Sequence, residues 1–436
     1  MRKSLALVLL AAMILLAACT SSKPAPAPQP AAPEAPKNVE LQFVFPVAVG
    51  GAVATAVENM VKDFNTANPN IKVTPVFAGN YQDTMTKVQT LTQGGTPPEV
   101  VVLQATDIFT LTDLKSVVPV DNYVAADKDG QAYIADFLPA FMANSKIDGK
   151  TYGIPFQRST VVMYYNKELF KAAGLTAAPK NWTELVDFGK KLTKADGSQW
   201  GLEMPSDGNP YWTYSGFFIQ SGKNVANDAG TEVYFNDPAV LEGLDFIMSL
   251  SATHKIMPKG VIKWGDVPND FATGKAAMIY HTTGSIGSLL TKMDPAKFGV
   301  APLPAGKKGG SPTGGGNFYI MKSTQDKQDA AWKFIRFMTD TQRVAAWSVA
   351  TGYVPSRKSA QETQTWKDAV AKFDGYKAAV DAMQSADREM ATHQNQQVLK
   401  AFGDQLQAVI GGSKDSKTAM EQAQKDATAI LAPFKK

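Results

Sequence analysis

The feature that most constrains the fold is a regular alternation of short apolar runs with helical segments near the start of the chain. Residues 41–45, 71–76 and 100–103 have the composition and patterning of β-strands, and apolar residues recur at helical spacing over 53–64 and 82–92. Strands separated by helices pair in parallel through right-handed crossovers, and the unbroken apolar run at 100–103 is typical of a strand buried on both faces. The sequence therefore predicts an α/β fold.

A second α/β region is expected to begin after Pro155. It would contain a strand at 161–165, a helix at 167–173 that ends at Gly174, and another helix that opens at 179–185. About 400 residues are too many for one ordinary core, so we expect two domains. Further helices are expected at 326–338 and over most of 361–436.

The N-terminus has the features of an export signal. Arg2 and Lys3 precede an apolar run at 5–16, which is too short to stay across a bilayer. Cys19 is the only cysteine, and its place after Leu-Ala-Ala resembles the lipobox of bacterial lipoproteins, in which the thiol is acylated. The alternative is a signal peptide that happens to end near a cysteine. The predicted segments are a signal peptide at 1–18 and a lipidated, Pro/Ala-rich tether at 19–37. The tether would hold the protein outside the cytoplasm, on the periplasmic or cell-surface side of the bacterial membrane.

Composition excludes several classes of function. Removing Arg2 and Lys3 from the 44 basic residues leaves 42 against 40 acidic ones, so no nucleic-acid surface is expected. The three histidines match no metal motif, and a Walker loop and Gly-x-Ser-x-Gly are both absent. We therefore expect no metal, no cofactor and no enzymatic activity. A carboxylate pair for glycoside hydrolysis leaves no signature in one sequence, so a glycan-hydrolysing lipoprotein stays the less favoured alternative, beside a structural or adhesive one.

Aromatic and amide side chains gather in segments that we expect to be loops after strands, where open α/β sheets bind ligands. Sugars and polyols stack their C–H faces on aromatic rings and need polar partners for their hydroxyl groups. The three glycines at 314–316 are predicted to form a flexible turn where the backbone passes close to another group, in preference to a phosphate cradle. The residues in these expected loops are Tyr81, 157–159, Tyr211, Trp212, Tyr214 and 281–283.

Three segments carry a family resemblance. Residues 64–73, 155–167 and 351–356 are similar to the extracellular solute-binding proteins of ABC importers, family 1, and the resemblance extends from about Val39 to the C-terminus. Within that family the pattern is most similar to the glycerol-3-phosphate-binding component. The resemblance implies a periplasmic-binding-protein-like fold of two α/β lobes joined by a hinge, a solute held in the interlobe cleft, and a monomer that delivers it to ABC permease subunits. The implied lobes are 38–153 plus 312–352 and 154–311 plus 353–436.

The resemblance also implies a ligand site, with two departures from the family pattern. Ala105 replaces a glutamate that takes the glycerol hydroxyls, so Gln104 or Asp107 would substitute for it. The C-terminal arginine for the phosphate is missing at 393–397, so Arg158, or Arg388 in a shifted register, would supply the charge. The predicted ligand-binding residues are Tyr81, Gln104, Gln157, Arg158, Ser159, Trp212, His281, Thr282, Gly315 and Tyr353.

These observations predict a lipid-anchored solute-binding protein that captures a carbohydrate or a polyol phosphate resembling glycerol 3-phosphate. A neutral sugar or an oligosaccharide is the alternative ligand.

Overall fold

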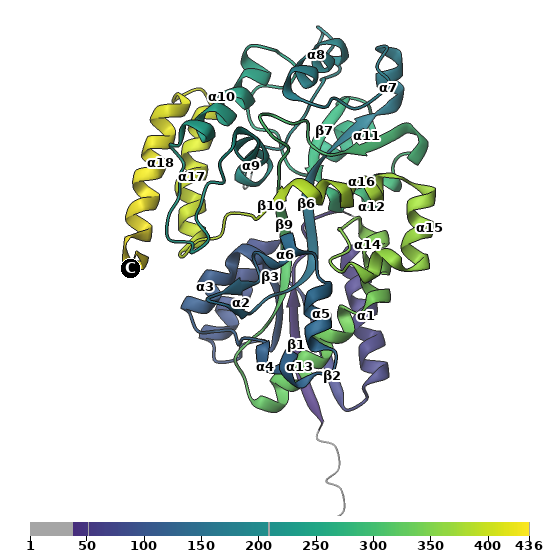
Figure 1. The fold of residues 1–436 in the computed structure, drawn as a ribbon, viewed down its shortest axis with the longest axis vertical. Coiled ribbons are helices and arrows are strands. Elements are labelled where there is room, and N and C mark those ends of the chain that lie inside the picture. The colour runs from purple at the N-terminus through teal and green to yellow at the C-terminus, as the bar shows by residue number, and fades with distance from the viewer. Residues whose placement is uncertain (1–37, 51, 208–209, 436) are drawn as a thin grey trace, which may run out of the picture. The chain divides into compact units, whose positions relative to one another are not determined.

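The computed structural model describes residues 38–50, 52–207 and 210–435 (Figure 1). The predicted signal peptide, the tether and Cys19 lie outside these residues. Within the described part, no helix combines the length and the apolar character needed to cross a membrane.

The predicted strand and helix alternation is confirmed. Strands β1 (Val39–Phe45), β2 (Ile71–Phe77) and β3 (Val100–Gln104) pair in parallel, with α1 (Val53–Ala67) and α2 (Tyr81–Gln93) as their connections. The strand order β2-β1-β3 places β1 in the middle of the three.

Helices cover both faces of this sheet because successive side chains of each strand point to opposite sides. On one face Phe43 packs in a cluster with Phe64 of α1 and Phe334 of α13 (Gln325–Met338). On the other face Val44 packs in a cluster with α2 and with α3 (Ile108–Asp113). The first four residues of β3 are fully buried, as the apolar run at 100–103 predicts.

Two long antiparallel strands connect the two halves of the described chain. The first part of β6 (Ile154–Asn166) pairs with β9 (Ser311–Ile320), which also pairs with β3. The second part of β6 pairs with β7 (Met278–Thr282) and β8 (Phe298–Ala301). Figure 1 shows β6 and β9 running together from the β1–β3 sheet towards β7. The strand expected at 161–165 is therefore the second part of a much longer strand.

Residues 314–316 were wrongly predicted to be a turn, because these three glycines belong to β9. The expected close backbone approach does occur there. Gly315 has φ of +91°, and a Cβ atom at this residue would lie 1.8 Å from the backbone oxygen of Gln157. A Cβ on Gly314 would lie 2.5 Å from the Trp212 ring. The glycines are needed because two neighbouring groups occupy the space of their missing side chains.

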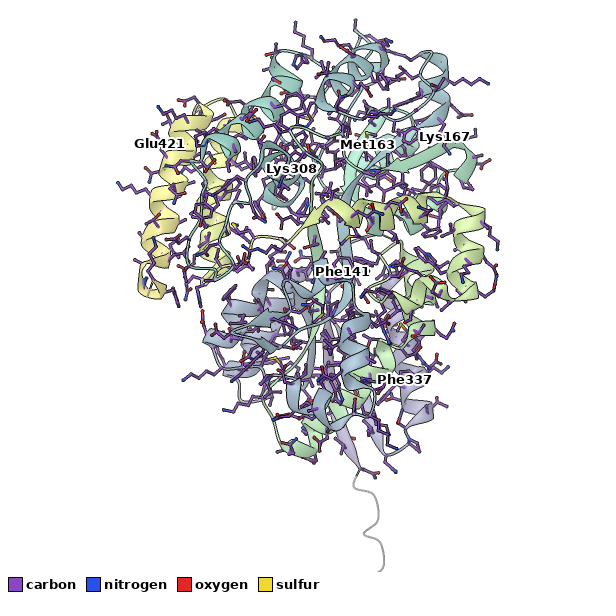
Figure 2. All side chains as sticks on the ribbon, viewed as in Figure 1. Phe141, Met163, Lys167, Lys308, Phe337 and Glu421 are labelled. Atoms are coloured by element: carbon purple, nitrogen blue, oxygen red, sulfur yellow. The ribbon has the colours of Figure 1, made fainter. Side chains whose placement is uncertain are left out.

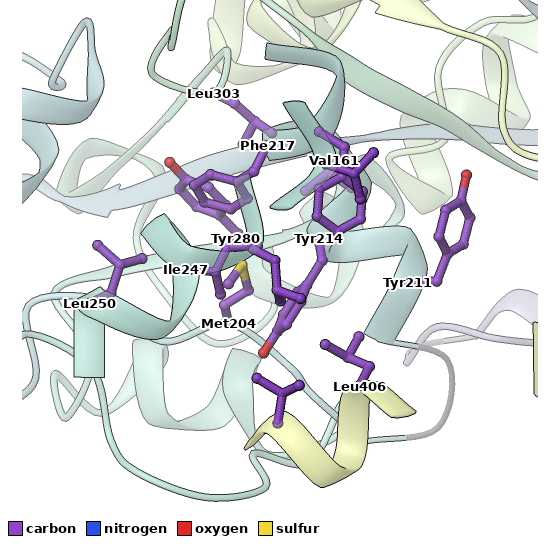
Figure 3. Packing of buried hydrophobic residues seen from close by; sticks show 14 of the residues in the cluster. Val161, Met204, Tyr211, Tyr214, Phe217, Ile247, Leu250, Tyr280, Leu303 and Leu406 are labelled. Carbon is purple, nitrogen blue, oxygen red and sulfur yellow. The ribbon is translucent and has the colours of Figure 1, made fainter. Parts of the chain in front are cut away.

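The second half has its own core, built mainly from helices. Figure 3 shows Tyr214 and Phe217 of α9 (Pro210–Ser221) beside Ile247 of α10 (Pro238–Ala252), together with Tyr280 of β7. Leu406 of α17 (Asn395–Ile410) and α18 (Ser416–Leu431) extend the same cluster. The predicted helices at 167–173, 326–338 and beyond 361 are confirmed with small shifts in their ends.

The remaining elements are mostly short helices on the outside of the two halves. They are α4 (Asp121–Ala126), α5 (Gly130–Asp136), α6 (Pro139–Met142), α7 (Lys167–Ala172), α8 (Trp182–Leu192), α11 (Val267–Ala272), α12 (Ile286–Leu290), α14 (Thr341–Thr351), α15 (Gln364–Lys372) and α16 (Gly375–Asp381), with the two-residue strands β4 (Lys146–Ile147), β5 (Lys150–Thr151) and β10 (Ala386–Asp387).

Candidate functional site

A cavity of about 500 Å³ lies at the junction of the two halves. Its walls come from the carboxyl ends of β1, β3 and β7 and from the long strands β6 and β9. The start of α2, helix α9 and the segments that follow α14 and β10 complete them. This volume falls within the range of small-molecule sites, about 300–1,000 Å³. The lining residues are Ala48, Val49, Asn80, Tyr81, Gln82, Gln104, Ser159, Pro205, Asp207, Trp212, Thr213, Trp264, Thr282, Gly315, Tyr353 and Glu389.

Tyr81 is held in place by a helix cap and by a side chain of β6. It is the first residue of α2, where the Asn80 and Asp83 side chains form a reciprocal capping box. Its hydroxyl donates to Gln157 Oε1 at 3.2 Å, and Gln157 Nε2 donates to the Pro46 carbonyl at 3.2 Å. Gln157 is fully buried and does not line the cavity, so it positions Tyr81 and the segment after β1.

Tyr353 lies beside Tyr81 because a left-handed glycine ends α14. Gly352, with φ of +87°, caps the helix and turns the chain towards the cavity. The Tyr353 ring stacks on Trp347 with centroids 5.9 Å apart, and its hydroxyl hydrogen-bonds with Tyr81. Burial raises the pKa of both phenols above their ordinary value, so both stay neutral donors at neutral pH.

Two tryptophans form the aromatic part of the wall. Trp212 is the one residue of α9 that is not buried, and its Nε1 donates to the Thr313 carbonyl at 2.8 Å. Trp264 lies 5.9 Å from the Trp212 ring centroid, and its backbone N–H donates to Asp207 Oδ1 at 2.7 Å. The Trp264 Nε1 donates to the carbonyl of Ala48, another lining residue, at 3.3 Å.

His281 supports Trp264 from behind rather than lining the cavity. The two rings lie 4.0 Å apart, and the imidazole contacts the Ser285 hydroxyl at 2.7 Å and the Trp264 carbonyl at 3.2 Å. Burial lowers the pKa of His281 to about 4, because the imidazolium would be desolvated there. The imidazole is therefore neutral at physiological pH.

One carboxyl group of the wall is deeply buried. Glu389, in the segment after β10, is only 3% exposed, and burial raises its pKa to about 8 against the opposing effect of Arg158. Arg158 is fully buried near it, donates Nη1 to Asn317 Oδ1 at 2.8 Å, and lies over the Phe141 ring, 4.9 Å from its centroid. Phe141 is labelled near the middle of the molecule in Figure 2. Arg158 itself does not line the cavity.

The structure brings seven of the ten predicted site residues into the cavity wall: Tyr81, Gln104, Ser159, Trp212, Thr282, Gly315 and Tyr353. It places Gln157, Arg158 and His281 behind that wall. Asp107, the alternative to Gln104, is also buried and outside the wall, where its Oδ1 accepts from Gln396 at 3.2 Å and burial raises its pKa to about 7.

The expected loop positions were wrong for most of these residues. Residues 157–159 belong to β6, His281 and Thr282 belong to β7, and Trp212 belongs to α9. Tyr211 and Tyr214, which share α9 with Trp212, are core residues. The cavity is therefore built largely on strands and a buried helix, which hold their side chains in fixed positions.

Sequence reasoning missed six polar or aromatic lining residues, Asn80, Gln82, Asp207, Thr213, Trp264 and Glu389. A sequence signal existed only for Trp264, an aromatic residue just before a helix start. Among the described residues, no lysine, arginine or histidine lines the cavity, and no group of side chains is suited to a metal ion. The wall thus offers aromatic faces, amides, hydroxyls and carboxyls, which suit a ligand rich in hydroxyl groups.

Two α/β lobes, joined by crossing strands and enclosing a cavity at their junction, define the two-lobed class of solute-binding proteins. A model of the family described as bacterial extracellular solute-binding protein matches residues 59–374. This match covers more than half of the chain, so the protein belongs to that family.

Known relatives agree with this assignment. The sn-glycerol-3-phosphate-binding periplasmic protein UgpB of Brucella abortus is 25% identical over 411 residues, covering 88% of this chain and 91% of the relative. UgpB from Mycobacterium tuberculosis, solved with glycerophosphocholine, superposes with a TM-score of 0.78 at 23% identity and covers 91% of this chain and 99% of its own. A substrate-binding protein from Listeria monocytogenes, solved with cycloalternan, gives 0.79 at 22% identity and 91% and 100% coverage. The predicted family and fold class are confirmed.

Proposed function

We propose that this protein is the solute-binding component of an ABC importer and that it captures a neutral carbohydrate in the cavity between its lobes. The single observation that carries the choice of ligand is the composition of the wall. Its described residues include Trp212, Trp264, Tyr81 and Tyr353 beside carboxyls and amides, and none of them has a basic side chain. A sugar ring stacks on the aromatic faces while its hydroxyl groups bond to the polar ones.

The proposed mechanism is closure of the two lobes around the solute. The proposed lobes are 38–153 plus 312–352 and 154–311 plus 353–436, which places the strands β6 and β9 at the boundary. The Trp264 hydrogen bond to Ala48 joins the two proposed lobes at the cavity wall. A solute that contacts both sides binds the closed form better and therefore shifts the population towards it. The closed form would then dock, as a monomer, on permease subunits.

A thermal-shift panel tests the ligand class. The full chain with Cys19→Ala, to prevent lipidation, is heated with neutral di- and trisaccharides, with polyols and with glycerol 3-phosphate. A ligand present at a hundred times its dissociation constant adds about 2.7 kcal/mol to the free energy of unfolding. We expect a neutral saccharide to raise the melting temperature and glycerol 3-phosphate to leave it unchanged. Stabilisation by glycerol 3-phosphate alone would contradict the proposal.

A polyol phosphate is the second candidate ligand, supported by the similarity to the Brucella abortus protein. Arg158→Ala separates the two candidates, because a phosphate held by this arginine would lose about tenfold to a hundredfold in affinity. A neutral sugar would lose little, since Arg158 does not line the cavity. Trp212→Phe against Trp212→Ala provides the matched pair for sugar stacking, because only alanine removes the aromatic face.

We also propose that the protein is tethered to the membrane by a lipid on Cys19 and acts by binding alone. Detergent phase partitioning tests the anchor: the wild-type protein from cells should enter the detergent phase, and Cys19→Ala should stay in the aqueous phase. Release of a product from any glycan by the purified protein would contradict the absence of catalysis.

A further inference from the structure

A buried glutamate and a buried arginine lie near each other at one side of the cavity, close enough for their charges to interact. Glu389 lines the cavity, and its backbone is fixed by two hydrogen bonds, from its N–H to Thr313 Oγ1 at 3.2 Å and from Asn144 Nδ2 to its carbonyl at 3.0 Å. Arg158 lies behind it on β6, at the point where β6 pairs with Gly315 of β9. Both side chains are at least 97% buried.

Each side chain retains polar atoms that have no hydrogen-bond partner among the described residues. These are Oε2 of Glu389 and both Nε and Nη2 of Arg158. A buried polar group without a partner is costly, and native structures keep few of them. The unpartnered Glu389 oxygen, which belongs to a lining residue, therefore points to a ligand that completes its hydrogen bonds.

The two groups influence each other although they form no ion pair. The nearby guanidinium lowers the pKa of Glu389 and the carboxyl raises that of Arg158, but burial dominates both values and moves them to about 8 and about 10. At neutral pH the arginine is charged and the acid is mostly protonated. A protonated carboxyl both donates and accepts a hydrogen bond, which matches the hydroxyl group of a sugar.

We propose that Glu389 is a specificity-determining residue that binds a hydroxyl group of the solute. Because it separates Arg158 from the cavity, it also prevents this arginine from binding anionic solutes. The positive charge that an anion would need is thus covered by a carboxyl group, which can bind a hydroxyl group instead. This inference rests on the proposed function only for the hydroxyl-bearing ligand. The masking of Arg158 is a property of the chain itself.

Shortening Glu389 tests the masking directly. Glu389→Ala should open the cavity to Arg158, so inorganic phosphate and glycerol 3-phosphate should bind about tenfold or more tightly than they bind the wild type. The double variant Arg158→Met/Glu389→Ala should lose this gain. Glu389→Gln keeps the length of the side chain and should gain no phosphate affinity. If Glu389→Ala does not fold, Glu389→Ser takes its place.

Asp207→Ala is the matched control, because it also removes a carboxyl from the wall. If relief of negative charge were sufficient, this variant would gain phosphate affinity to the same extent, and the inference would be overturned. It would also be overturned if neither Glu389→Ala nor Glu389→Ser bound phosphate, or if the gain persisted without Arg158.

Tight binding of glycerol 3-phosphate by the wild type has two distinct meanings. If that binding survives Arg158→Met, the proposed neutral ligand is wrong and the masking stands. If it is lost in Arg158→Met, the arginine is already available to anions and the masking is wrong.

Discussion

Gly315→Ala is expected to destabilise the protein strongly, because this glycine has both an unusual backbone conformation and no free space. Its φ of +91° costs an L-residue about 1–2 kcal/mol. The added Cβ would lie 1.8 Å from the Gln157 carbonyl oxygen, so β6 and β9 must move apart, and such overpacking costs about 1–3 kcal/mol. The two contributions together predict a loss of about 2–5 kcal/mol in the free energy of unfolding.

Urea denaturation followed by circular dichroism measures this loss from the shift of the transition midpoint at constant slope. Gly403→Ala is the matched control, since Gly403 lies inside α17 with no atom within 4 Å of the added Cβ. Alanine is the better helix former by about 1 kcal/mol, so the control should be slightly stabilised. A change below about 1 kcal/mol in Gly315→Ala would refute the reasoning, because backbone strain alone should exceed it.

Three further predictions concern the surroundings of the cavity. Trp264→Phe removes the hydrogen bond to the Ala48 carbonyl and should weaken solute binding by about 1 kcal/mol, or roughly fivefold in affinity. Calorimetric titration measures this change, and an unchanged affinity would mean that the hydrogen bond does not assist closure. The pKa of His281 is about 4 in the folded protein and about 6.5 in the unfolded chain, so the unfolded chain binds a proton first as the pH falls. The free energy of unfolding should therefore decrease between about pH 6.5 and pH 4, by up to about 3 kcal/mol. His281→Gln should lose that part of the pH dependence in denaturation midpoints, and an identical profile would contradict the assignment. Asp107 has the opposite effect on the pH dependence of stability, because its pKa of about 7 in the folded protein exceeds the unfolded value. Stability is therefore lost as pH rises from about 4 to 7. Asp107→Asn should make the stability less dependent on pH in that range, and a steeper dependence would count against the prediction.

The parallel sheet was predictable because its signals are local. Apolar alternation and helical spacing in 41–103 are short-range patterns, and tertiary packing reinforced them. The helix α9 was missed for the opposite reason. It is buried almost all round, so it has no amphipathic stripe, and its Asn-Pro start favoured a loop.

The chemistry of the site was predictable only in part, because residue type does not reveal burial. Arg158 was expected to meet a ligand, whereas its Nη1 bonds to Asn317, a residue that the chain brings close only by pairing β6 with β9. Glu389 gave no signal, since glutamates are ordinarily exposed and the buried cavity wall around it is assembled from distant segments. Tyr81 and Tyr353 were placed by the family resemblance, and both line the cavity.

Calorimetric titration of one protein with two ligands tests the central claim most directly. The Cys19→Ala chain is titrated with the neutral saccharide that gives the largest thermal shift and, in parallel, with glycerol 3-phosphate, and both titrations are repeated with Trp212→Ala. We predict saturable binding of the saccharide that weakens at least tenfold in Trp212→Ala, with no measurable binding of glycerol 3-phosphate. Tighter binding of glycerol 3-phosphate than of any neutral saccharide would contradict the account.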